Sequence, residues 1–195
     1  MKKLMVIALF TFVASASAYG QSDHPKFQVF GGYSHFSADV RFDDPFDNDG
    51  NDFFNQREGL HGFGFSGAAN FSKHLGVVGD FSYHKRAIEL GPGSDIDFST
   101  FNFLFGPRFT ARGDRVEGFV HGLVGGVRRK VENFDSDVDL ALGVGAGIDI
   151  KVSRNFGIRL VQIDYIPFRD TNPFTLDKEW RDNLRVQVGA TISFD

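Results

Sequence analysis

Three residues whose side chains serve in nucleophilic catalysis, Asp80, Ser82 and His84, stand at alternate positions of one short segment. A serine nucleophile needs an imidazole beside it as general base and a carboxylate that orients the imidazole. Side chains two positions apart on a β-strand point in parallel and stand roughly 7 Å apart, so a hydrogen bond between Ser82 and His84 would be poor. The spacing therefore leaves acyl hydrolysis as an alternative function and not as the first prediction.

A second candidate site is the acidic stretch at residues 43–52, which is dense in aspartates and turn-forming residues. Carboxylate oxygens at alternate positions with a glycine among them suit Ca²⁺. The EF-hand pattern is not met, because Pro45 stands in the first-ligand position and Gln56 in the twelfth. We predict a solvated acidic loop, with weak divalent-cation binding as the alternative. The ligands of that alternative are Asp43, Asp47, Asp49 and Asp52.

Composition excludes several classes of chemistry. The chain has 195 residues, a formal charge of −4 and no cysteine, so disulfides, thiolate metal sites and a cysteine nucleophile are absent. An acidic chain without a clustered basic stripe argues against nucleic acid as a partner. The string at 62–67 matches GxGxxG, but it lies within an expected strand and opens no helix, so no dinucleotide cofactor is predicted.

The N-terminal stretch has the three parts of a secretory signal. Met1-Lys2-Lys3 is a short basic head, residues 4–13 form an apolar run, and Ala16-Ser17-Ala18 is a small-residue cleavage site. The apolar run is too short for a transmembrane helix. We expect residues 1–18 to be a signal peptide and residues 19–195 to form the mature domain.

The mature chain divides into eight segments in which apolar and polar residues alternate, as in half-buried β-strands. Long connections follow the first, third and seventh segments, and tight polar turns follow the second, fourth and sixth. The polar stretch at 176–183 is the best candidate for a turn or two of helix. The segments are 26–36, 59–71, 75–84, 98–110, 117–129, 138–151, 156–166 and 183–194.

The composition of the two strand faces decides which one points outward. One face carries Leu, Val, Ile and Phe, and the other carries mostly Gly, Ala, Ser, Thr and Asn. A water-facing exterior would be richer in Lys and Glu, whereas small residues and matched charges suit the narrow interior of an eight-stranded barrel. We therefore predict an all-β, eight-stranded antiparallel up-and-down transmembrane β-barrel with its apolar face toward lipid. A soluble lipocalin-like ligand binder, with the apolar face inside, is the alternative.

Strand parity predicts a set of ionisable side chains inside this barrel. Asp164 and Arg185 lie near the same end of adjacent antiparallel strands and are expected to pair. Asp149 and Arg159 flank a tight turn, but strict alternation puts Arg159 outward, so their pairing requires a bulge or a snorkelling side chain. We predict a structural salt-bridge network, because an unmatched buried charge is costly. Its members are Asp80, His84, Arg108, Asp149, Asp164 and Arg185.

Three stretches carry a resemblance to a known family. They are residues 103–109 (FLFGPRF), 158–165 (IRLVQIDY) and the terminal 187–194 (QVGATISF), whose spacing resembles the insertion signal of outer-membrane barrels. With the export signal, the whole mature chain resembles the small eight-stranded outer-membrane barrels of the OmpA-like and OmpX-like type. One departure is Asp195, which follows the aromatic residue on which the family usually ends. No peptidoglycan-binding domain follows, so a wall-tethering role is not expected.

The resemblance implies a location in the outer membrane of Gram-negative bacteria and a porin-like barrel architecture. It also implies contact with outer-membrane lipid and lipopolysaccharide, and with the barrel-assembly machinery during insertion. We predict a monomeric, non-enzymatic barrel with a non-conducting lumen and no cofactor, acting through its extracellular loops on a surface ligand that the sequence does not identify. The alternatives are a lipid-modifying acyl hydrolase using Ser82 and His84 and the soluble ligand binder.

Overall fold

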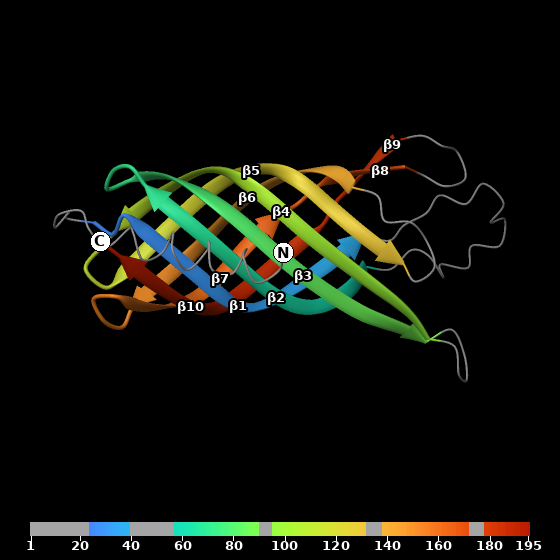
Figure 1. The fold of residues 1–195 in the computed structure, drawn as a ribbon, viewed down its shortest axis with the longest axis horizontal. Helices are drawn as coiled ribbons and strands as arrows, with labels where there is room; N and C mark the ends of the chain where they lie inside the picture. Colours follow the sequence, from blue (N-terminus) through green and yellow to red (C-terminus); the bar gives the residue numbers. More distant parts are fainter. Residues whose placement is uncertain (1–23, 40–56, 90–94, 132–137, 172–177) are drawn as a thin grey trace, which may run out of the picture.

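The protein is described by a computed structural model that covers residues 24–39, 57–89, 95–131, 138–171 and 178–195. None of these residues forms a helix long and apolar enough to cross a membrane. The wall of the structure consists of eight long strands (Figure 1). They are β1 (Phe27–Asp39), β2 (Arg57–Asn70), β3 (Leu75–Glu89), β4 (Asp95–Arg112), β5 (Val116–Val131), β6 (Val138–Lys151), β7 (Phe156–Tyr165) and β10 (Leu184–Phe194).

These strands form a closed antiparallel cylinder. Each one pairs with the next along the chain, and β1 pairs with β10 from Phe27↔Phe194 to Ser37↔Leu184. Closure pairs every wall strand with a neighbour on each side along the body of the cylinder, so the backbone polar groups there find partners within the sheet. The predicted fold class is confirmed, and each of the eight predicted segments coincides with a wall strand.

A small hairpin stands at one end of the cylinder, where the sequence favoured a short helix. It consists of β8 (Phe168–Thr171) and β9 (Lys178–Arg181), which pair antiparallel. Phe168 of β8 also pairs with Ala141 of β6, so the hairpin continues the wall locally. The helix expected at 176–183 is therefore wrong for residues 178–181, because pairing with β8 overrides the local helical preference of this polar stretch.

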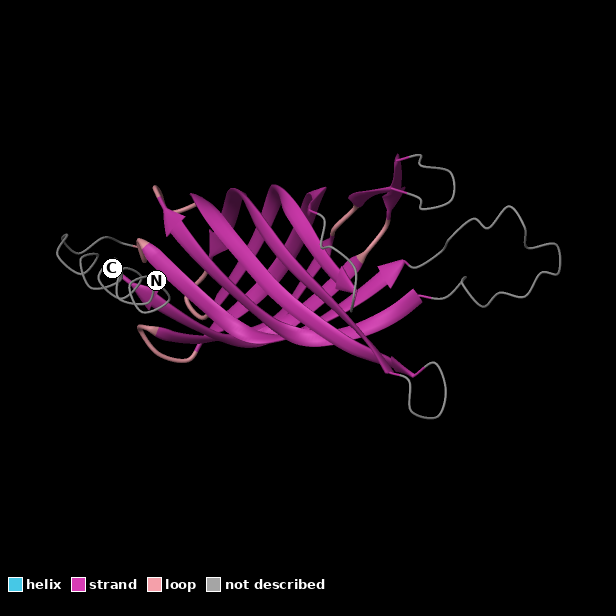
Figure 2. Ribbon diagram, turned by 45° about the vertical axis from the view of Figure 1, so that its right-hand side comes forward, coloured by secondary structure: helices cyan, strands magenta, loops and turns pink. Residues whose placement is uncertain are grey.

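The two ends of the barrel differ. Short turns at 71–74, 113–115 and 152–155 lie at one end, together with the start of β1 and the end of β10 (Figure 2). We call this the turn end. The opposite end, which carries the β8–β9 hairpin and the tips of β3 and β4, is called the loop end. The acidic residues Asp43, Asp47, Asp49 and Asp52 lie outside the described residues, so the candidate calcium loop stays a prediction.

The outer face of the barrel is apolar. Along β6, for example, Leu140, Leu142, Val144 and Ile148 are all exposed, whereas Ala141 and Asp149, on the opposite face, are buried. The same holds around the cylinder. Exposed apolar and aromatic side chains come from all eight wall strands, including Phe63, Leu75, Phe105, Val120, Ile158 and Val188. This arrangement matches the predicted polarity and is opposite to that of a soluble lipocalin-like barrel.

One β-bulge interrupts the alternation. In β7 the pairing with β6 passes from Ile148↔Val161 to Asp149↔Arg159, so Leu160 has no partner of its own. The pairing with β10 shifts at the same place. A bulge residue lets two consecutive side chains lie on the same side of the sheet. As a consequence Arg159 points into the lumen, and its outward placement by strict alternation was wrong.

Candidate functional site: the polar network inside the barrel

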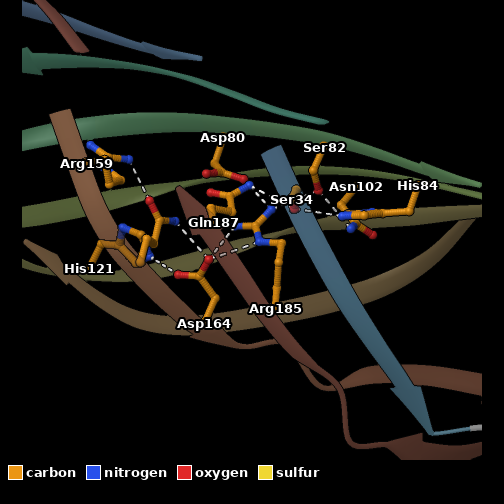
Figure 3. A network of polar contacts seen from close by, with 11 residues as sticks. Ser34, Asp80, Ser82, His84, Asn102, His121, Arg159, Asp164, Arg185 and Gln187 are labelled. Atoms are coloured by element: carbon orange, nitrogen blue, oxygen red, sulfur yellow. Dashed lines mark hydrogen bonds and ion pairs between the residues drawn. The ribbon is translucent and has the colours of Figure 1, made fainter. Parts of the chain in front are cut away.

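The lumen contains a continuous chain of hydrogen bonds and ion pairs, shown in close-up in Figure 3. Arg185 of β10 lies at its centre and is fully buried. Its Nη1 donates to Asp80 Oδ1 at 2.6 Å and to Ser82 Oγ at 2.9 Å. Its Nη2 and Nε donate to Asp164 Oδ2 at 2.8 and 3.0 Å. One guanidinium therefore holds two carboxylates that come from β3 and β7.

Asp164 extends the network away from Arg185. Its Oδ1 lies 2.7 Å from His121 Nε2, and its Oδ2 accepts a 2.8 Å hydrogen bond from Gln162 Nε2. Gln162 Oε1 in turn accepts from Arg159 Nη1 at 2.6 Å. The acceptor sites of the buried Asp164 carboxylate are thus shared among three partners, an arrangement that offsets the cost of burying its charge.

A second ion-pair group lies closer to the turn end. Arg159 donates from Nε and Nη2 to the two oxygens of Asp149, at 2.7 and 3.1 Å, which is the bidentate geometry of strong arginine–carboxylate pairs. Arg108 Nη2 lies 3.6 Å from Asp149 Oδ2. Phe119 lies beneath both guanidiniums, 4.0 Å from Arg108 and 4.5 Å from Arg159. Phe30, which also points inward, lies with its ring centroid 4.2 Å from the Arg159 guanidinium, so this aromatic ring has a cationic partner in the lumen.

The turn end of the lumen opens to a cavity of about 280 Å³. Its lining includes Glu117, Asp149 and Lys151. The Glu117 carboxylate pairs with Lys151 Nζ at 2.9 Å and with Arg112 Nε at 3.3 Å. The polar filling therefore runs from the turn-end mouth to the middle of the barrel.

A separate polar group contains His84. Its Nε2 lies 2.7 Å from Ser34 Oγ, which also accepts a 3.3 Å hydrogen bond from Gln187 Nε2. Ser82 Oγ instead accepts from Arg185 and from Asn102 Nδ2, the latter at 3.0 Å. Ser82 and His84 are therefore engaged with different partners, and both side chains are buried. The structure does not bring them together as a nucleophile and its base.

Apolar side chains complete the filling of the lumen. They form one buried cluster that includes Phe36, Leu60, Leu104, Val127, Ile166 and Phe168. Phe36 also packs against the His84 ring, with the ring centroids 5.2 Å apart. The sequence predicted small residues and paired charges inside the barrel but not this cluster, because an inward Leu or Phe looks like a break in the alternation.

Inward glycines provide the space for the network. A Cβ on Gly145 would lie 1.9 Å from Asp164 Oδ1 and 2.7 Å from His121 Nε2. A Cβ on Gly64 would lie 2.1 Å from Gln187 Nε2. All three distances are far below van der Waals contact, so the absence of a side chain at these positions is what lets the polar groups lie there.

The six predicted lumen residues all point inward and are buried: Asp80, His84, Arg108, Asp149, Asp164 and Arg185. The expected pairing of Asp164 with Arg185 is present, and the bulge in β7 permits the pairing of Asp149 with Arg159. Sequence reasoning missed His121, Gln162 and Ser34. The described residues contain no group of three or more His, Cys, Asp or Glu side chains that could hold a metal ion.

A closed barrel with an apolar exterior and a buried polar network defines the class of integral outer-membrane barrels. Residues 6–194 match the family described as Outer membrane protein beta-barrel domain, and the chain belongs to this family. Membership implies the bacterial outer membrane as its location. Comparison with curated proteins returned no match.

Solved structures with the same fold include one protein from Neisseria and one from Yersinia pestis. The Neisserial surface protein A is 14% identical, with a TM-score of 0.62 over 89% of this chain and 100% of that chain. Ail, the attachment invasion locus protein of Yersinia pestis, is 21% identical, with a TM-score of 0.53 over 88% of this chain and 99% of that chain. A second structure of Ail, at 20% identity over 88% and 99% of the two chains and a TM-score of 0.53, is a complex with the heparin analogue sucrose octasulfate. At these identities the similarity concerns the fold.

Proposed function

We propose that this protein is a monomeric, non-enzymatic outer-membrane barrel with a non-conducting lumen, which presents its loop end to the cell exterior for interaction with surface partners. The observation that carries the proposal is the filled interior. The Arg185 side chain forms ion pairs with Asp80 and Asp164 across the lumen. A buried apolar cluster that includes Phe36 and Leu60 packs inside the same barrel. A pore needs a continuous water-filled path, and side chains that fill the lumen work against such a path.

The proposed orientation puts the turn end in the periplasm and the loop end outside. Outer-membrane barrels have short periplasmic turns and longer extracellular loops. In this proposal residues 1–18 are removed on export, and the barrel-assembly machinery recognises the terminal strand β10. The apolar belt contacts membrane lipid, and the outer rim contacts lipopolysaccharide.

The charge of the longest loop bears on the kind of partner. Residues 40–56 contain five aspartates and one arginine, so this loop is strongly acidic. Ail has been solved with a heparin analogue, which is a polyanion. Like charges repel, so we propose that this loop favours a basic or cation-bridged partner over sulfated polysaccharide. Asp43, Asp47, Asp49 and Asp52 are the residues that would bind a bridging divalent cation.

The acyl-hydrolase alternative finds no support in the geometry of Ser82 and His84. Its test is incubation of the purified barrel with radiolabelled phospholipid or lipid A, with wild type beside Ser82→Ala. We expect no release of acyl chains from either protein. Release that depends on Ser82 would overturn the non-enzymatic proposal.

The orientation of the barrel in the membrane is tested with two variants, each of which carries the same inserted protease site at a different place. One insertion is made within residues 40–56 and the matched insertion at residues 113–115, the turn between β4 and β5. In intact cells we expect cleavage of the first and protection of the second, while both proteins stay heat-modifiable on detergent gels. Cleavage at 113–115 in intact cells would contradict the proposed orientation. Ion conductance of the wild-type barrel in planar bilayers would contradict the closed lumen.

A further inference from the structure

Two imidazole rings meet on the outer surface of the barrel, toward the loop end. His35 of β1 and His61 of β2 are directly opposite each other in the strand register. Their ring centroids lie 5.0 Å apart, with 53° between the ring planes. The His61 side chain is exposed and that of His35 is half-buried, so the pair faces outward and takes no part in the lumen network.

The spacing of the two rings suits a shared metal ion. Zinc–imidazole bonds are about 2.0–2.1 Å long, and with a tetrahedral angle at the metal the centroids of two bound rings lie about 5 Å apart. The centroid separation of His35 and His61 agrees with this value. A cross-strand pair is also fixed by the sheet, so little ordering is needed before an ion binds.

Tyr33 supports His61 in the way that metal-binding histidines are commonly supported. The Tyr33 hydroxyl is hydrogen-bonded to His61 Nδ1. When Nδ1–H donates to this oxygen, Nε2 carries the free lone pair that a metal requires. In the part of the chain that the structure describes, no hydrogen bond occupies His61 Nε2 or the ring nitrogens of His35. The donor atoms of the pair are therefore available.

Gly59 provides the room in which the His35 ring lies. A Cβ on Gly59 would lie 2.9 Å from His35 Cε1 and 3.3 Å from His35 Nε2. The His35 ring therefore leans over β2, the strand that carries His61. Larger residues at position 59 would collide with this ring and displace it.

We propose that His35 and His61 form a binding site for a late first-row divalent transition metal such as Zn²⁺, Ni²⁺ or Cu²⁺. Imidazole suits these ions, whereas Ca²⁺ and Mg²⁺ prefer oxygen ligands. Since the described residues contain no group of three or more candidate ligands, the remaining coordination positions are taken by water or by groups from the surrounding lipid. The site is open and lies outside the barrel wall.

Lys85 provides the main competing interpretation. It is directly opposite His61 on the next strand, so a row of His35, His61 and Lys85 crosses three neighbouring strands. Such a row also resembles a phosphate-binding surface. The two interpretations predict opposite effects of removing the Lys85 charge. An ammonium group repels a metal cation and attracts a phosphate.

The test uses the folded barrel, purified in detergent without a polyhistidine tag. Binding of Cu²⁺ is measured by electron paramagnetic resonance, and binding of Zn²⁺ by calorimetry. For the wild type we expect about one ion per chain and hyperfine coupling to two imidazole nitrogens. His35→Ala and His61→Ala should each abolish the two-nitrogen signal, and Tyr33→Phe should weaken Zn²⁺ binding about 10- to 100-fold. The matched control is His74→Ala, an exposed histidine at the turn end, which should leave binding unchanged.

Lys85→Met separates the two interpretations. Tighter or unchanged Zn²⁺ binding in this variant supports the metal site. The site is refuted if wild type shows no ion bound, or if His35→Ala and His61→Ala bind metal as wild type does. It is also refuted if inorganic phosphate binds in place of the metal and its binding is lost in Lys85→Met. Gel mobility before and after heating confirms that every variant is folded.

Discussion

Arg185 Nη1 donates a 2.6 Å hydrogen bond to Asp80 Oδ1 across the lumen, between residues that are 105 positions apart in the chain. The same guanidinium binds Asp164 on the neighbouring strand β7. Arg185 therefore ties β3, β7 and β10 to one another inside the barrel.

Removing the Arg185 charge should destabilise the barrel strongly. Arg185→Met leaves the Asp80 and Asp164 carboxylates buried without their shared partner, and breaking a buried ion pair in this way costs about 3–5 kcal/mol. Urea unfolding of the protein in lipid vesicles measures the change. The matched control is Arg154→Met. Arg154 is exposed and pairs with Asp195, so its loss should cost less than about 1 kcal/mol. Equal stability of the two variants would contradict the proposed role of the network.

Gly145→Ala should disturb the network without changing any charge. The added methyl group would overlap Asp164 Oδ1 and crowd His121 Nε2, and overpacking of this kind costs about 1–3 kcal/mol. Gly122→Ala is the matched control, because its Cβ would meet no atom within 4 Å. Stability of both variants is measured by the same urea titration. A Gly145→Ala barrel as stable as Gly122→Ala would show that the space at Gly145 is not needed.

Deletion of Leu160 should be tolerated, although it shortens a wall strand. Leu160 is the extra residue of the β7 bulge, so its loss makes the pairing with β6 and β10 regular and keeps Arg159 and Gln162 facing inward. Deletion of Val124 in β5 is the control. The pairing of β5 with β6 is regular there and contains no extra residue. A deletion would therefore send every residue on one side of it to the opposite face of the sheet. Folded yield on heat-modifiability gels should be near wild type for the first deletion and low for the second.

A charge in the apolar belt should impair insertion far more than a charge in a turn. Val144 lies midway along β6 and is 59% exposed to the outside. Arginine at the bilayer midplane costs about 2–4 kcal/mol. Asp114→Arg in the exposed turn between β4 and β5 is the control for Val144→Arg. Refolding yields in lipid vesicles are compared, and equal yields would refute the lipid-facing assignment of Val144.

The wall of the barrel could be predicted from sequence because its signal is local. The alternation of apolar and polar residues in segments such as 138–151 can be read from consecutive residues alone. The composition of each strand face then indicates whether it points to lipid or to the lumen. The ion pair of Asp164 with Arg185 could be predicted too, because both residues lie at the same end of consecutive long segments. These features depend on strand parity and on neighbours along the chain.

Other features depend on the closed shape and were not predictable in this way. The bulge at Leu160 moves Arg159 inward, and nothing in the local pattern marks an extra residue between Arg159 and Val161. His121 joins Asp164 from a strand whose inward face also carries Leu123, so its direction could not be read from alternation. The β8–β9 hairpin forms because the wall offers it a pairing edge near Ala141.

The sequence order of the central charges has a consequence for biogenesis. Asp80 and Asp164 are synthesised before Arg185, which arrives on the last strand. Any intermediate in which β1 to β7 have entered the hydrocarbon without β10 would bury two carboxylates without the arginine that they share, a state that the bilayer disfavours strongly. We therefore expect the two carboxylates to gain their arginine as β10 joins β1, so that half-inserted species are disfavoured and the barrel enters the membrane cooperatively.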